Sequence, residues 1–105
     1  MAFVRTVTYT FPYSKITELQ TGTDLWLRLV SAHKLIAQES EGMLDTGVWI
    51  TQSPNGEMRV VNVTEWYSIE EMERFANDPD VKFHEAEVLK QTTGAPLVEV
   101  YEVIG

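Results

Sequence analysis

The sequence predicts an α+β fold in which one antiparallel sheet is covered by helices on one face. Segments of alternating apolar and polar residues predict four strands, and segments with apolar residues at helical spacing predict the helices. Their order along the chain is strand, helix, strand, strand, helix pair, strand. This β-α-β-β-α-β order is typical of the ferredoxin-like plan. We expect residues 1–105 to form a single domain.

The first strand and the first helix are separated by a long polar connection. Residues 2–11 alternate along the chain and are rich in β-branched and aromatic side chains, which predicts a strand that Pro12 ends. After the connection, Thr23 is a suitable N-cap. Apolar residues then recur at helical spacing up to Gln38 or Glu39. The sequence therefore predicts one long helix here.

A β-hairpin follows this helix. Gly42 is placed to end the helix, and residues 43–53 alternate as a strand does. The turn Pro54-Asn55-Gly56 suits a tight reversal, because Asn-Gly tolerates the positive φ angles that such turns require. The next strand, residues 57–67, must then pair antiparallel with the preceding one.

The strand over residues 57–67 carries apolar side chains on both faces. One face holds Met58, Val60, Asn62, Thr64 and Trp66, and the other holds Arg59, Val61, Val63, Glu65 and Tyr67. A sheet face exposed to water usually carries polar residues. We therefore expect helices on one face of the sheet and a second copy of this chain on the other, giving a homodimer through the sheet face.

Two capped helices and a final strand complete the chain. Ser68 opens a capping box, in which its hydroxyl accepts the Glu71 N–H and the Glu71 carboxylate accepts the Ser68 N–H. At Asp78-Pro79 the chain breaks, because Asp caps well and Pro suits the first helical position of a second helix over residues 80–90. The last strand is predicted over residues 97–104.

The composition excludes several classes of function. The chain has 8 basic and 16 acidic residues, a net charge of -8, without a run of Lys or Arg, so nucleic acid and anionic membranes are not expected partners. The sequence contains no cysteine, which excludes disulfides and thiolate metal sites. It also lacks a glycine-rich phosphate loop and a membrane-spanning apolar segment. We expect a cytoplasmic protein with neither cofactor nor metal.

Short motifs carry a resemblance to a known family. They are Glu65-Trp66 at a strand end, Ser68 with Glu70-Glu71 at a helix start, Asn77-Asp78-Pro79 at the break, and Phe83-His84 beyond it. With them the chain resembles the antibiotic biosynthesis monooxygenase-type domain of the dimeric α/β-barrel superfamily. The resemblance implies that two copies pair sheet to sheet. It also implies one of that superfamily's activities, which include cofactor-independent oxygenation and haem degradation.

The chain departs from the family pattern in two respects. Family members often place a His midway along the helix after the Glu-Trp pair, where this chain has Arg74-Phe75-Ala76, and the nearest His is His84. The haem-degrading branch has an Asn on the first strand and a Trp on the second helix. Here the first strand has no Asn, and Phe75 stands in place of that Trp. Haem degradation is therefore the less favoured activity.

Asn62 and Trp66 are candidate site residues because they share one strand face. The Trp66 indole offers a plate for a planar aromatic substrate, and the Asn62 amide can both donate and accept hydrogen bonds. Each has an alternative role: Trp66 as a core side chain, and Asn62 as an amide bonded to a neighbouring strand or to water.

Four further residues are candidates for substrate binding or proton transfer. Arg5 and Tyr9 share one face of the first strand and could hold a phenolate or a developing oxyanion. The alternative for Arg5 is an ion pair with an acidic strand neighbour such as Glu99. His33 and His84 are candidate general bases, with packing or surface roles as alternatives.

The functional hypothesis is a homodimeric, cofactor-independent monooxygenase acting on an aromatic or polyketide-like molecule. In it, His33 or His84 deprotonates a phenolic substrate, which is held against Trp66 by Asn62, Arg5 or Tyr9, so that the resulting carbanion reacts with oxygen directly. The alternative is a non-enzymatic domain of the same fold that binds a small ligand or a partner.

Overall fold

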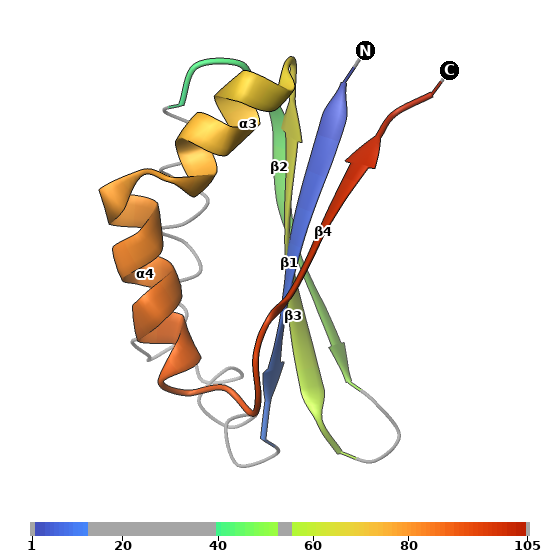
Figure 1. The fold of residues 1–105 in the computed structure, drawn as a ribbon. Helices are drawn as coiled ribbons and strands as arrows, with labels where there is room; N and C mark the ends of the chain where they lie inside the picture. Colours follow the sequence, from blue (N-terminus) through green and yellow to red (C-terminus); the bar gives the residue numbers. More distant parts are fainter. Residues whose placement is uncertain (1, 13–39, 53–55, 105) are drawn as a thin grey trace.

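The computed structural model describes residues 2–12, 40–52 and 56–104. In chain order these residues form β1 (Phe3–Phe11), β2 (Met43–Gln52), β3 (Met58–Trp66), α3 (Ile69–Ala76), α4 (Pro79–Leu89) and β4 (Leu97–Glu102). The strands form one layer, and α3 and α4 lie beside it as a second (Figure 1). Each of these elements was predicted from the sequence to within a few residues, while the first predicted helix lies outside the described residues.

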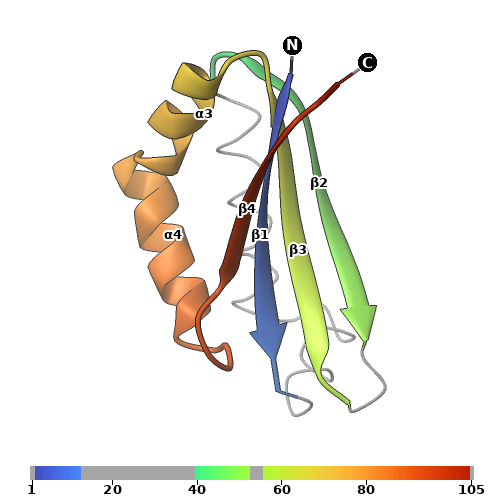
Figure 2. The ribbon, with the colours of Figure 1, turned by 45° about the vertical axis from the view of Figure 1, so that its right-hand side comes forward.

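The four strands form one antiparallel sheet in the order β2-β3-β1-β4. β1 therefore lies between β3 and β4, two strands far from it in sequence (Figure 2). This order and the helices on one face confirm the predicted α+β ferredoxin-like fold. β2 and β4 are the edges of the sheet.

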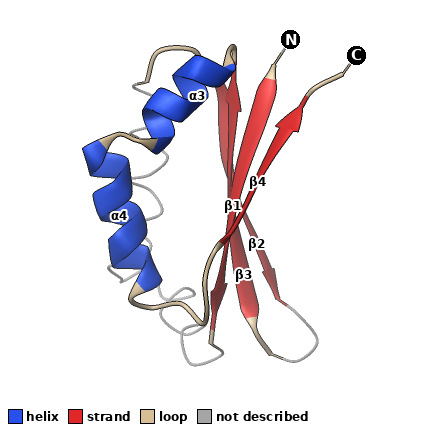
Figure 3. Ribbon diagram, in the orientation of Figure 1, coloured by secondary structure: helices blue, strands red, loops and turns tan. Residues whose placement is uncertain are grey.

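The two faces of the sheet differ in what covers them. On the face that α3 and α4 cover, here called the helix face, the side chains of β1 and β3 are buried: Arg5, Val7, Tyr9, Phe11, Met58, Val60, Asn62, Thr64 and Trp66. The opposite face, here called the outer face, carries half-buried or exposed residues such as Val4, Trp49 and Val63. Figure 3 shows both described helices on the same side of the strands.

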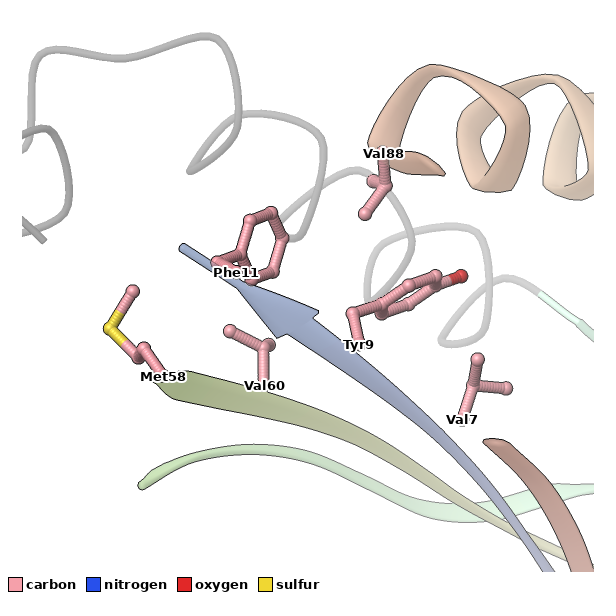
Figure 4. Packing of buried hydrophobic residues seen from close by; sticks show 6 residues of the cluster. All are labelled: Val7, Tyr9, Phe11, Met58, Val60 and Val88. Carbon is pink, nitrogen blue, oxygen red and sulfur yellow. The ribbon is translucent and has the colours of Figure 1, made fainter. Parts of the chain in front are cut away.

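The buried hydrophobic side chains of the described residues form two clusters. The first, here called the Tyr9 cluster, contains Val7, Tyr9, Phe11, Met58, Val60 and Val88. Its side chains rise from β1 and β3 toward Val88 on α4 (Figure 4). The second, here called the Trp66 cluster, contains Trp66, Met72, Phe75 and Val81. One cluster thus holds the end of α4 on the sheet, and the other holds α3 and the start of α4.

The helix starts are fixed by side-chain caps, although one predicted bond is absent. Ser68 Oγ accepts the N–H of Glu71 at 3.3 Å, as predicted. The predicted reciprocal bond was wrong, because the Glu71 carboxylate lies against Gly42, where Glu71 Oε2 is buried without a hydrogen-bond partner. Gly42, with φ of 83°, accepts the Tyr67 N–H at 2.8 Å and so brings the chain close to the start of α3.

The start of α4 matches its predicted cap. Asp78 Oδ1 accepts the Asp80 N–H at 2.8 Å, and Pro79 occupies the first turn, where its missing N–H costs nothing. Neither helix in the described part of the chain is long and apolar enough to cross a bilayer. The break at Asp78 lets α3 and α4 follow the sheet as two separate segments.

Candidate functional site

A band of polar side chains separates the two hydrophobic clusters. On β1, Arg5 lies between Phe3, which packs against the Trp66 cluster, and Val7 of the Tyr9 cluster. On β3 and on α4, polar residues likewise lie between residues of the two clusters. We call the resulting group the polar seam: Arg5, Asn62, Thr64, His84 and Glu85.

The seam is assembled by strand register. Arg5 is the cross-strand partner of Thr64, and Val7 is the partner of Asn62. Directly opposite residues in an antiparallel pair lie about 5 Å apart, and diagonal neighbours on the same face about 7 Å. Arg5 and Tyr9 therefore flank Asn62 diagonally. Thr64 also donates from Oγ1 to the carbonyl oxygen of Arg5 at 3.4 Å, which links the two strands within the seam.

Arg5 forms an ion pair with Glu85 of α4. Both guanidinium nitrogens Nη1 and Nη2 lie 3.4 Å from Glu85 Oε1. Arg5 is only 7 % exposed, so its charge needs this partner. The alternative partner, Glu99, was wrong: it is opposite Thr6 on the outer face and accepts the Tyr101 hydroxyl at 2.6 Å. Neighbouring residues on a strand point to opposite faces of the sheet. Because Arg5 precedes Thr6 by one residue, Arg5 and Glu99 lie on opposite faces.

Tyr9 is a neutral phenol in this environment. Burial raises its pKa well above the usual value of 10.0, the Glu85 carboxylate raises it further, and the Arg5 guanidinium partly opposes both. Its side chain is fully buried in the Tyr9 cluster. Tyr9 therefore keeps its proton and can donate a hydrogen bond to an anionic oxygen, which is the role that the sequence predicted for Arg5 or Tyr9.

Asn62 is a buried amide with an unused acceptor. The residue is 3 % exposed, and its Oδ1 has no hydrogen-bond partner. Its cross-strand partners on both sides, Val7 and Val48, have side chains that can offer no donor. Oδ1 therefore makes no cross-strand bond, and a bond to water, the other alternative for Asn62, stays a prediction. A buried, unpaired carbonyl oxygen is costly, and such groups are often found where a ligand or water supplies the missing donor.

His84 lies on the side of α4 that carries the buried residues. Val81, His84, Glu85 and Val88 are spaced as one helical face, and the outer two are buried. His84 Nδ1 is buried without a partner, and the ring meets Phe83 edge-on with a centroid distance of 5.7 Å. The imidazole therefore has a buried nitrogen whose hydrogen-bonding capacity is unused.

Trp66 lies in the Trp66 cluster, away from the seam's centre. Its side chain is fully enclosed, with its ring centroid 4.8 Å from that of Phe75. Its Nε1 is buried without a partner. The packing role that the sequence left open for Trp66 accounts for its enclosure, and stacking against a substrate stays a prediction.

The remaining predicted residue, His33, lies outside the described residues. Sequence reasoning missed Glu85, which supplies the only ion-pair partner that the described residues offer to Arg5. A signal was present in the sequence, because Glu85 is a carboxylate on the helical face that also carries the apolar residues Val81 and Val88. Among the described residues no group of three or more His, Asp or Glu side chains is placed to hold a metal ion.

Many solved structures share this fold. Neither the known protein-family models nor the curated proteins match this sequence. Among solved structures, a Nitrosomonas europaea protein provisionally named an antibiotic biosynthesis monooxygenase matches with a TM-score of 0.75 and 11% identity, covering 98% of this chain and 90% of its own. The chain has the antibiotic biosynthesis monooxygenase fold.

Two further solved structures extend this comparison. SnoaB, a cofactor-independent oxygenase from Streptomyces nogalater, matches with a TM-score of 0.69 and 9% identity, covering 100% of this chain and 96% of its own. Rv0793 from Mycobacterium tuberculosis matches with a TM-score of 0.71 and 13% identity, covering 100% and 97%. At these identities the likeness establishes the fold alone, so the function has to be argued from the polar seam.

Proposed function

We propose that this protein is a cofactor-independent monooxygenase that acts on an electron-rich aromatic or polyketide-like small molecule bound at the polar seam. The observation that carries the proposal is the buried, unpartnered Oδ1 of Asn62. Asn62 is the diagonal neighbour of Arg5 and of the neutral Tyr9 on the same face of the sheet, so this face carries one acceptor and two donors. SnoaB, a cofactor-independent oxygenase of the same fold, supports the choice of chemistry.

The acceptor and the donors have distinct roles in this proposal. Asn62 Oδ1 accepts a hydrogen bond from a substrate hydroxyl and so orients the ring. Tyr9 and Arg5 donate to the oxygen that becomes negative when the substrate loses a proton. Glu85 holds Arg5 in place through their ion pair, and is a positioning residue. The burial of these groups strengthens each interaction because little water competes.

His84 is the proposed base, with His33 as the second candidate. The His84 imidazole takes a proton from the activated C–H of the substrate, and the electron pair passes into the aromatic system. The resulting carbanion reduces dioxygen, and one oxygen atom enters the substrate as a carbonyl while the other leaves as water. All four electrons that reduce O₂, and both hydrogens of the water, come from the oxidised CH₂ group, so the reaction R₂CH₂ + O₂ → R₂C=O + H₂O balances without an external reductant.

Oxygen uptake with an anthrone or a hydroquinone tests this proposal. We expect Asn62→Ala and His84→Ala each to lower kcat by roughly 100-fold or more, because each removes one acid-base or orienting group. Lys82→Ala is the matched control, since Lys82 is exposed on the same helix as His84. Circular dichroism and thermal melting confirm that each variant folds.

Three outcomes are distinguishable. A rate that falls in both site variants and not in the control supports the proposed roles. Unchanged rates in Asn62→Ala and His84→Ala would overturn them. Saturable binding of the aromatic compound to the wild type without oxygen uptake would instead favour the ligand-binding alternative, and the proposal of oxygenase activity would be abandoned.

A further inference from the structure

Asn62 stands between two valines in the sheet. Its direct cross-strand partners are Val7 on β1 and Val48 on β2. Directly opposite residues in an antiparallel pair have Cβ atoms about 5 Å apart, so both valine side chains lie beside the Asn62 amide. Val7 is buried, and the half-buried Val48 packs against the Tyr9 cluster. Neither side chain has a hydrogen-bonding group, and Asn62 Oδ1 is buried without a partner.

The polar side chains near Asn62 on the helix face do not supply the missing donor. Arg5, diagonal to Asn62, is paired with Glu85 of α4. Thr64, two residues along β3 on the same face, donates from Oγ1 to the carbonyl oxygen of Arg5. The Tyr9 hydroxyl, on the other diagonal, does not bond Oδ1 either. The acceptor is therefore left to a molecule from outside the fold.

A threonine in place of Val48 would supply a donor from within the sheet. Threonine differs from valine by a hydroxyl in place of one methyl group, and both residues favour strands. At a position directly opposite Asn62, this hydroxyl is within hydrogen-bond reach of Oδ1. Such a bond would remove the cost of a buried, unpaired carbonyl oxygen. The valines therefore leave the sheet less stable than a nearly identical sequence would, which is common at binding sites.

We propose that Val7 and Val48 are specificity-determining residues of the polar seam, because they keep Asn62 Oδ1 free for a ligand that carries a hydroxyl or N–H group. An ether or a quinone offers only acceptors, so it leaves this oxygen unpaired and binds less tightly. The inference rests on the proposed function, since it requires a ligand at the seam. It adds the chemical feature by which that ligand is selected.

Val48→Thr tests this inference through stability and ligand binding together. We expect the new hydroxyl to donate to Oδ1 and to raise the melting temperature by about 5 °C. A ligand hydroxyl can then reach Oδ1 only after this internal bond opens. One hydrogen bond of ordinary net strength corresponds to a roughly 5-fold loss of affinity. KM should rise by that factor, and kcat should stay the same because Asn62 is still present to orient the bound ring.

Calorimetric titration without oxygen measures binding separately from turnover. The probes are hydroquinone and its dimethyl ether, which has the same ring without a donor. The wild type should bind hydroquinone roughly 5-fold more tightly than the ether, and Val48→Thr should bind both about equally. Val7→Thr makes the same change from β1 and should act in the same direction.

Val63→Thr is the matched control. Val63 is a half-buried valine next to Asn62 on β3, but it lies on the outer face, where a hydroxyl cannot reach Oδ1. The control should neither raise the melting temperature nor change the affinity for hydroquinone. In an Asn62→Leu background, Val48→Thr should lose its stabilising effect, because the acceptor is gone.

The outcomes separate this inference from the proposed oxygenase activity. A wild type that takes up no oxygen but shows the expected binding pattern would refute the activity and support the assignment of the valines. Four results would overturn the assignment: a wild type that binds neither probe or does not distinguish them, threonine variants no more stable than the wild type, threonine variants that bind hydroquinone as tightly as it does, or a gain in stability that persists with Asn62→Leu.

Discussion

Neutralising Glu85 is expected to destabilise the fold far more than neutralising the acid of a surface ion pair on the same helix. Arg5 is 7 % exposed, and in Glu85→Gln its charge would lose the carboxylate 3.4 Å away. At an effective dielectric constant near 20 the attraction at this distance is about 5 kcal/mol, and the partial exposure of Glu85 reduces what is lost to about 3 kcal/mol. For a domain of this size, the melting temperature should fall by about 12 °C or more.

Denaturant unfolding followed by circular dichroism measures this effect. Glu87→Gln is the matched control, since Glu87 forms an exposed ion pair with Lys90 on the same helix and should lose less than about 1 kcal/mol. The double variant Arg5→Met/Glu85→Leu removes both charges and should lose less than Glu85→Gln alone. The reasoning is refuted if Glu85→Gln and Glu87→Gln lose the same stability, or if the double variant loses the sum of its single substitutions.

Two further predictions concern the other constrained residues. Because the pKa of Tyr9 is raised in the folded state, its contribution to stability is complete below pH 10.0 and is lost as the pH rises toward the folded value. Tyr9→Phe should therefore make the alkaline fall in the free energy of unfolding shallower by up to about 1.4 kcal/mol per pH unit. Equal slopes for the wild type and the variant, in denaturation at successive pH values, would contradict this. Gly42→Ala should lower the free energy of unfolding by at least about 1 kcal/mol more than Gly94→Ala does. Both glycines have a positive φ, but only a Cβ at Gly42 meets the Glu71 carboxylate. Equal melting temperatures of the two variants would show that this carboxylate moves away at no cost.

Most of the fold follows from local patterns in the sequence. The alternation in residues 2–11 and 57–67, the Ser68 and Asp78 caps, and the break at Pro79 each act within a few residues, so the described elements were predicted correctly. The same patterns indicated which side chains share a strand face. They placed Arg5 with Tyr9 on one face of the first strand and Asn62 with Trp66 on one face of the strand over residues 57–67.

Partners across the fold were harder to predict. Arg5 was assigned a possible strand neighbour, Glu99, but its partner is Glu85, 80 residues away in sequence on α4. The second half of the Ser68 capping box failed for a similar reason, because the approach of Gly42 to α3 places the Glu71 carboxylate elsewhere.

The sequence by itself determined the strands, the helix starts and the face on which each strand residue lies, because backbone geometry and local hydrogen bonding set these over short distances. Only the tertiary structure decided that Asn62 Oδ1 is left without a donor and that Glu85 meets Arg5. These features depend on strand register and on how α4 lies across the sheet. Register brings together residues distant in the chain, and no local pattern specifies which of them will meet.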